Sequence, residues 1–269
     1  MLTRILTSIV AFLLFLPFLI FSDTIAFPIG MALCAVISTY ELIRCVGLHK
    51  NQLVTIPLVL VAAAAPICLR LLGISTALSL AWIVVPVLMI FMLAITVFSH
   101  GKVDITQSST ALMLSIYVMV GFVAMVYVRD FHEGGKYFYL LCFIGAWVTD
   151  TFAYFSGRLF GKHKLIPDVS PKKTVEGAIG GVVFCALAAM LYGFILKTFI
   201  GEITFVSYLS LALIGVVIAV ISQIGDLVAS IIKREEGVKD YGNLIPGHGG
   251  ILDRFDSVLI TAPLTEVLL

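Results

Sequence analysis

The sequence predicts an all-α, polytopic integral membrane protein with about nine transmembrane helices and a cytoplasmic N-terminus. Of its 269 residues, 61% are hydrophobic and only 12% are charged, and the mean hydropathy is +1.13. Charged residues make up about 25% of soluble domains, so this composition excludes a soluble globular protein. Apolar runs of roughly 20 residues, the length that crosses a bilayer, lie near 5–22, 25–45, 53–72, 75–98, 108–128, 137–157, 175–199, 204–232 and 251–268.

The first apolar segment follows a short Met-Leu-Thr-Arg start and resembles the core of a signal peptide. No small-residue cleavage site follows it, and eight further apolar segments do. We therefore interpret the first segment as a retained helix.

The basic residues are distributed unequally between the two sides of the predicted membrane. With nine spans, 13 of the 17 Lys and Arg residues fall on the face that carries the N-terminus, and the other face has Arg70, Arg129, Lys136 and Lys197. Because cytoplasmic loops are enriched in Lys and Arg, the N-terminus and the long charged loops are predicted to be cytoplasmic. Such a face attracts anionic lipids and phosphate compounds. No basic domain or motif indicates a nucleic-acid partner.

The polar residues divide the chain into two regions. Residues 1–130 form about five nearly featureless spans, in which Glu41 and Arg44 are interpreted as an interfacial pair that reaches toward water. Residues 131–269 hold most of the polar groups and two cytoplasmic loops, at 158–174 and 233–250. We expect this C-terminal region to carry the function.

The sixth span contains a carboxylate. Asp150 lies about two helical turns inside the predicted boundary, and Tyr154 follows on the same helical face. A charged group at the centre of a membrane helix costs roughly 2.5–3.5 kcal/mol on insertion scales, so it needs a partner or a wet cavity. Asp150 is therefore either part of a site or a partner in a hydrogen bond between helices.

The loop at 158–174 is strongly basic. Ser170 and Pro171 predict the N-cap and first residue of a helix, and its free N–H groups, with Lys172 and Lys173, are suited to an anion. The stretch Gly157–His163 is not a Walker A loop, since it has too few residues between its glycines and no Ser or Thr after the lysine. We expect a phosphate site of another kind.

The eighth span carries a polar stripe. Ser222, Asp226 and Ser230 recur every four residues, and Lys233 and Arg234 follow one turn later. These positions share one face of a helix, so that face is expected to contact a cavity or other helices instead of lipid. Asp226 is the second intramembrane carboxylate.

The last loop and the ninth span combine glycines with carboxylates. Five glycines surround His248 and permit close backbone approach and turns with positive φ, and the span then opens with Asp253 and Asp256. These two side chains are neighbours on a helix, so a cation must hold them. Arg254 with nearby lysines, shared protonation, or Mg²⁺ bound through carboxylates and substrate phosphates could do so, and a structural salt-bridge network is the alternative.

These residues resemble the signature of the phosphatidate cytidylyltransferase (CDP-diglyceride synthase) family. The matching positions run over 27 residues, and an earlier stretch, from Asp150 to Gly177, resembles the family's second block. Together they cover about the last 120 residues. The positions of the signature are Ser230, Lys233, Arg234, Lys239, Asp240, Gly242, Pro246, His248, Gly249, Gly250, Asp253, Arg254 and Asp256.

The resemblance implies an integral membrane nucleotidyltransferase that condenses CTP with phosphatidic acid to CDP-diacylglycerol and pyrophosphate. It implies a homodimer, and a magnesium centre with a second cation such as K⁺ beside it, held by Asp226, Asp253 and Asp256. Lys239 and His248 join these as catalytic candidates. The expected substrate-binding residues are Asp150, Tyr154, Arg158, Lys162, Ser170, Lys172, Lys173, Thr174, Ser230, Lys233, Arg234, Asp240 and Arg254.

Two other classes of function compete with this interpretation. A cation-coupled transporter would also need intramembrane carboxylates, but its polar residues should be distributed across the membrane's depth and in both halves of the chain. A related CTP-dependent lipid enzyme, such as a polyprenol kinase or an archaeal-lipid cytidylyltransferase, would share the membrane setting and the nucleotide. We expect the protein to lie in a bacterial cytoplasmic membrane, with its active site on the cytoplasmic side.

Overall fold

The structure is a computed structural model of the chain, and it describes residues 10, 13–200, 207–244, 247 and 249–269. Over these residues it contains nine helices and one short β-hairpin, so the predicted all-α class is confirmed. The chain forms two compact units. Unit 1 comprises Met1–Phe131 and Glu235–Phe255, and unit 2 comprises His132–Arg234 and Asp256–Leu269.

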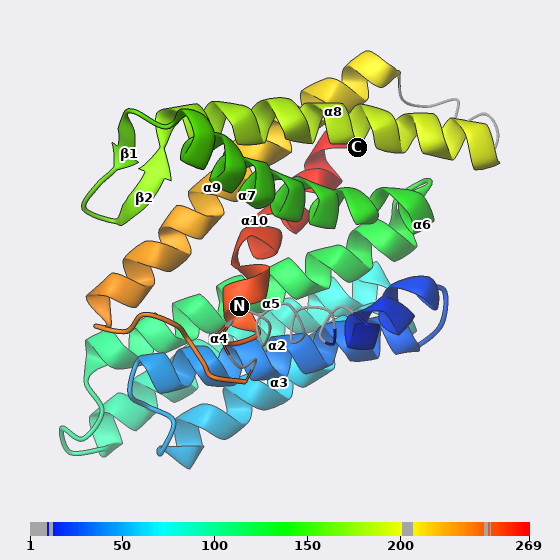
Figure 1. The fold of residues 1–269 in the computed structure, drawn as a ribbon. Coiled ribbons are helices and arrows are strands. Elements are labelled where there is room, and N and C mark those ends of the chain that lie inside the picture. The colour runs from blue at the N-terminus through cyan, green and yellow to red at the C-terminus, as the bar shows by residue number, and fades with distance from the viewer. Residues whose placement is uncertain (1–9, 11–12, 201–206, 245–246, 248) are drawn as a thin grey trace. The chain divides into compact units, whose positions relative to one another are not determined.

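Four long helices make up most of the described part of unit 1. They are α2 (Ala26–Cys45), α3 (Gln52–Leu72), α4 (Ile74–Phe98) and α5 (Ile105–Phe131). Helices α2, α3 and α5 pack side by side (Figure 1) around fully buried side chains such as Phe27, Leu58 and Phe122. Most apolar side chains of α4 are exposed instead, as expected of a helix that faces lipid.

Unit 2 contains α6 (Gly135–Phe138), α7 (Leu140–Phe160), β1 (Lys164–Ile166), β2 (Ser170–Thr174), α8 (Val175–Ile200) and α9 (Tyr208–Glu235), and α10 (Leu252–Leu268) continues into it from unit 1. Helices α7 and α8 run alongside each other (Figure 1). A Cβ on Gly180 would lie 2.2 Å from Oγ of Ser156, and one on Gly177 would lie 2.6 Å from the Ala153 carbonyl oxygen. Glycines on α8 therefore allow this close approach, as small residues do between membrane helices.

Seven helical segments of the described residues are long and apolar enough to cross a membrane. They correspond to the second to eighth predicted spans, and α6 and α7 together form one of them. The protein is thus an integral membrane protein. The first predicted span, 5–22, falls partly outside the described residues. The ninth is a helix, α10, but it has only 17 residues and carries three charges near its start, so it is not among the seven.

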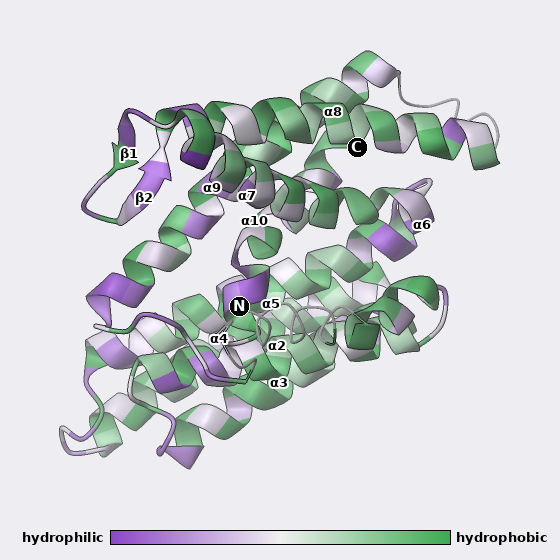
Figure 2. Ribbon diagram, viewed as in Figure 1, coloured by the Kyte–Doolittle hydropathy of each residue, from purple (hydrophilic) through white to green (hydrophobic). Residues whose placement is uncertain are grey.

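The β-hairpin corrects the helix start predicted at Ser170. Ser170–Thr174 pairs antiparallel with Lys164–Ile166, and α8 begins only at Val175. The N-cap is Thr174, whose Oγ1 accepts a hydrogen bond from the Gly177 N–H at 3.1 Å. Figure 2 shows hydrophilic residues along this hairpin and at the C-terminal end of α9, while the helices are mainly hydrophobic.

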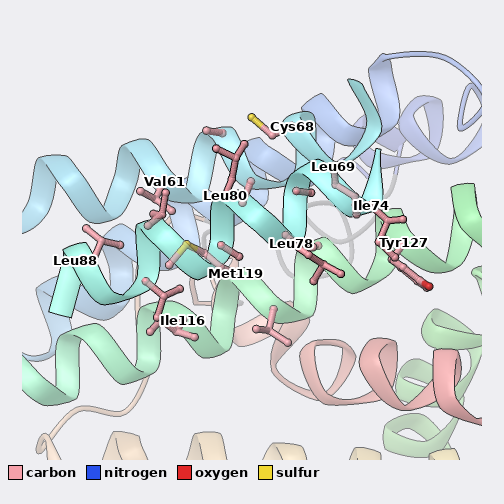
Figure 3. Close-up of a pocket in the computed structure, with 18 of the residues that line it drawn as sticks. Val61, Cys68, Leu69, Ile74, Leu78, Leu80, Leu88, Ile116, Met119 and Tyr127 are labelled. Carbon is pink, nitrogen blue, oxygen red and sulfur yellow. The ribbon is translucent and has the colours of Figure 1, made fainter. Parts of the chain in front are cut away.

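An apolar cavity of about 530 Å³ lies within unit 1 (Figure 3). Helices α3, α4 and α5 line it with side chains that include Cys68, Leu78 and Met119. None of the site residues predicted from the sequence lines this cavity. The polar chemistry of the chain must therefore be sought elsewhere.

An arginine links three segments of unit 1. At the end of α3, the Arg70 guanidinium donates two hydrogen bonds to the carboxylate of Asp130 on α5, one of them at 2.6 Å from Nε. It also donates to the carbonyl oxygens of Ser22, at 2.8 Å, and of Thr24. Such a two-pronged pair is stronger and more directional than a single ion pair. Arg70 therefore fixes the ends of α3 and α5 to the turn before α2.

We expect Arg70→Ala to lower the free energy of unfolding by about 2 kcal/mol, because hydrogen bonds to a charged group are lost. Among the described residues, the nearly buried Asp130 would keep one cationic partner, Arg129. Thermal unfolding in detergent measures the effect. Lys102→Ala, at an exposed position of the same unit, is the matched control. Equal unfolding temperatures for the two variants would contradict the proposed role of Arg70.

Candidate functional site

Three carboxylates gather in unit 2. Asp226 on α9 forms an ion pair with Lys173 of β2. The buried Asp256, 8% exposed, interacts electrostatically with the charges of Asp226, Asp150 and Lys233. Gly225 of α9 faces α10, where an added Cβ would lie 3.3 Å from Cβ of Ile260 and 3.4 Å from the Asp256 carbonyl oxygen.

Asp150 is connected to the same group of residues. Its Oδ2 accepts a hydrogen bond from Oγ of Ser257 at 3.2 Å, and the Ser257 N–H donates to Oδ1 of Asp256 at 2.8 Å. The structure therefore brings together Asp150, Asp226 and Asp256, which lie far apart in the sequence. We call these three residues, with Lys173 and Lys233, the unit 2 cluster.

The third predicted metal ligand, Asp253, belongs to unit 1. It is 7% exposed, and its Oδ2 accepts hydrogen bonds from the N–H groups of Tyr241, at 2.9 Å, and Gly250, at 3.0 Å. Asp253 thus fixes the backbone of the glycine-rich loop, and it precedes Asp256 by one turn of α10. Gly237, Gly247 and Gly249 adopt positive φ, as predicted for this loop.

The other site residues predicted from the sequence differ in their exposure and in their contacts. Arg158 donates a hydrogen bond to Oη of Tyr154 at 3.3 Å, and both side chains are exposed. Thr174 is buried and its hydroxyl caps α8, so the structure shows a structural role for it. His248 lies outside the described residues. Ser170 and Ser230 are half-buried, and the exposed candidates are Lys162, Lys172, Arg234, Lys239, Asp240 and Arg254.

The interpretation of Glu41 as an interfacial residue is wrong. Arg44 is exposed, but Glu41 is 5% exposed, and its carboxylate accepts hydrogen bonds from the backbone N–H groups of Ile251 and Leu252. Glutamate is almost never buried unless it is paired or hydrogen-bonded. The sequence could not reveal these partners because they lie more than 200 residues away.

A second unpredicted contact supports the base of the hairpin. The Glu176 carboxylate at the start of α8 accepts hydrogen bonds from the backbone N–H groups of Lys162, at 3.0 Å, and His163. It also contacts Nδ1 of His163 at 2.7 Å. These bonds hold the two ends of the basic loop together and so place Lys173 within reach of Asp226.

The whole chain matches a known family of enzymes. Residues 2–269 match the model of the cytidylyltransferase family. The chain belongs to this family. It is 37% identical over 267 residues to the phosphatidate cytidylyltransferase of Staphylococcus haemolyticus, with 99% of this chain and 98% of the relative aligned. It is 36% identical, over 282 residues and the same shares of both chains, to the proteins of that name from Staphylococcus saprophyticus and Staphylococcus aureus.

The family assignment confirms the resemblance drawn from the C-terminal motifs and extends it to the first five spans. This cytidylyltransferase is therefore an enzyme that uses CTP, and the transporter interpretation is set aside. The motifs alone covered less than half of the chain. The first half could not be assigned from them because its only common feature was apolar helices of suitable length.

Proposed function

We propose that the chain is a phosphatidate cytidylyltransferase, which condenses CTP with phosphatidic acid to form CDP-diacylglycerol and pyrophosphate in phospholipid synthesis. The observation that carries the proposal is the unit 2 cluster, in which an ion pair, hydrogen bonds through Ser257 and electrostatic interactions link three carboxylates and two lysines within an apolar chain of this family. Paired acidic and basic groups are what a site for two phosphate-bearing substrates and a metal requires.

The acidic residues fit a magnesium ion that also binds substrate phosphates. Among the described residues, no three His, Cys, Asp or Glu side chains lie close enough to hold a metal by themselves. Mg²⁺ does not need such a group, since one or two carboxylates suffice when phosphates and waters supply the other ligands. The like charges of Asp150, Asp226 and Asp256 interact, and a divalent cation would relieve their repulsion.

We assign Mg²⁺ to Asp226 and Asp256, with Asp253 one turn earlier on α10, and a second cation such as K⁺ beside them. When bound, the ion supplies charge neutralisation at the α-phosphate of CTP and at the leaving pyrophosphate. Asp226 also neutralises the ammonium of the half-buried Lys173.

The chain's basic residues then act on the substrates. The phosphate of phosphatidic acid is already ionised, so it attacks the α-phosphorus of CTP without a strong general base, and positioning and charge neutralisation dominate. Lys173 and Lys233 of the cluster, with Lys172, Arg234 and Lys239, are proposed to reduce the repulsion between the two anions.

The proposed site faces the cytoplasm and the inner leaflet. The excess of Lys and Arg in alternate loops supports this orientation, and it would give access to CTP in solution and to phosphatidic acid in the membrane. We also propose a homodimer, which light scattering of the purified protein in detergent would test.

The position of the transferred phosphorus distinguishes the proposal from a lipid kinase. We expect label from the α-phosphate of CTP, and none from the γ-phosphate, to appear in lipid when phosphatidic acid is the acceptor. Polyprenol and an archaeal ether-lipid phosphate serve as competing acceptors. Transfer of the γ-phosphate to polyprenol, or faster transfer to the ether lipid, would contradict the assignment.

A further inference from the structure

A buried carboxylate of α2 lies at the start of α10, within unit 1. Oε1 of Glu41 accepts the Ile251 N–H at 3.1 Å, and Oε2 accepts the Leu252 N–H at 2.9 Å. The first N–H groups of a helix have no partner within the helix, and a negative charge at this end is favoured by the helix dipole. Glu41 therefore caps α10 through the backbone.

Two glycines of the last loop make room for this carboxylate. A Cβ on Gly250 would lie 2.2 Å from Oε1 and 2.3 Å from Oε2 of Glu41, and one on Gly242 would lie 2.3 Å from Oε1. Neither glycine has a positive φ. These positions thus require glycine for space around Glu41, whereas Gly237, Gly247 and Gly249 adopt the turn conformation that favours glycine.

Asp253 also holds the same backbone. Its Oδ2 accepts the Gly250 N–H, next to the N–H that Glu41 binds, and also the Tyr241 N–H. Two buried carboxylates therefore determine where the loop ends and where α10 begins. A displacement of Glu41 would shift the first turn of α10, which carries Asp253, and Asp256 follows three residues later.

We propose that Glu41 is a positioning residue for the cytidylyl transfer: it holds the first turn of α10 so that Asp253 is correctly oriented for the Mg²⁺–CTP complex. This inference depends on the proposed function. Glu41 is not a catalytic residue, because each of its two oxygens accepts a backbone N–H, whereas both N–H groups that bind Asp253 donate to Oδ2. Carboxylates that orient metal-binding groups typically contribute 10-fold to 100-fold in metal affinity or activity.

The test uses the purified full chain with Glu41→Gln and Glu41→Ala. Glutamine keeps one acceptor oxygen, so we expect an intermediate effect from Gln and the larger one from Ala. Glu41→Ala should raise the Mg²⁺ concentration for half-maximal rate, or lower kcat, by about 10-fold or more. It should also speed amide hydrogen exchange at residues 249–253. Glu133→Gln, at an exposed position of unit 2, should leave both readouts unchanged.

The kinetic and exchange results distinguish a Glu41 that positions Asp253 for catalysis from one that only stabilises the fold. Faster exchange in Glu41→Ala with wild-type kcat and Mg²⁺ requirement would overturn the positioning role, and unchanged exchange would overturn the cap itself. A wild-type protein that transfers no cytidylyl group would instead contradict the proposed function. In that case the exchange data would still decide whether Glu41 caps α10.

A double substitution tests the contact between Glu41 and Gly250 directly. Gly250→Ala alone should reduce activity and unfolding temperature, because the new methyl group overlaps with the carboxylate. In the Glu41→Ala protein this overlap is absent, so Gly250→Ala should lower activity and unfolding temperature clearly less than it does in the wild type. Such non-additivity is expected for residues in contact. Fully additive losses would contradict the contact.

Discussion

The Asp253→Asn protein is expected to transfer cytidylyl groups at least about 100-fold more slowly than the wild type while remaining folded. The side-chain amide keeps an oxygen that can accept the N–H groups of Tyr241 and Gly250, so the loop retains these bonds. The substitution removes the negative charge proposed to bind Mg²⁺. Initial rates at saturating CTP and phosphatidic acid, over a range of Mg²⁺ concentrations, measure the effect.

Asp168→Asn is the control for this prediction, since it makes the same chemical change at an exposed position in the hairpin turn. It should keep the wild-type rate. Unfolding temperature in detergent shows whether each variant is folded. Full activity in a well-folded Asp253→Asn protein would remove Asp253 from the proposed metal site.

The second large effect is expected at the ion pair of Asp226 and Lys173. Asp226→Asn should also slow transfer at least about 100-fold, because it removes a proposed metal ligand and the partner of a half-buried ammonium. Lys173→Met should act differently, raising the KM for CTP about 10-fold or more through the loss of a phosphate-binding charge. Steady-state kinetics with varied CTP separate the two effects.

Lys164→Met is the matched control for Lys173→Met. Lys164 is on the same hairpin, but its Nζ donates to the Pro171 carbonyl oxygen at 2.6 Å. Its loss should therefore leave the KM for CTP near the wild-type value. If Lys164→Met and Lys173→Met raised KM equally, the effect would come from the hairpin as a whole, and the specific role of Lys173 would be contradicted.

Hydropathy predicted most of the fold because crossing a membrane requires long apolar helices. The seven described spans agree with it. The hairpin of Lys164–Thr174 was missed because its strands are only three and five residues long and carry lysines and a proline, which strands disfavour. Ser170 and Pro171 also gave a false helix start, whereas the cap is Thr174.

The sequence located the acidic and basic candidates but not the contacts that hold them. The four-residue spacing on α9 indicated that Asp226 faces other groups, and it pairs with Lys173 of the basic loop. Glu41 was misinterpreted because local spacing suggested Arg44 as its partner. Its actual partners are the N–H groups at the start of α10, and only the folded chain brings these together.

The most direct test of cytidylyl transfer uses the purified protein in detergent with base-labelled CTP, phosphatidic acid and Mg²⁺. We predict that label enters the lipid phase with release of one pyrophosphate for each labelled lipid. A chelator should abolish the transfer, and excess Mg²⁺ should restore it. Absence of labelled lipid in a folded protein, or transfer that is unaffected by the chelator, would contradict the account.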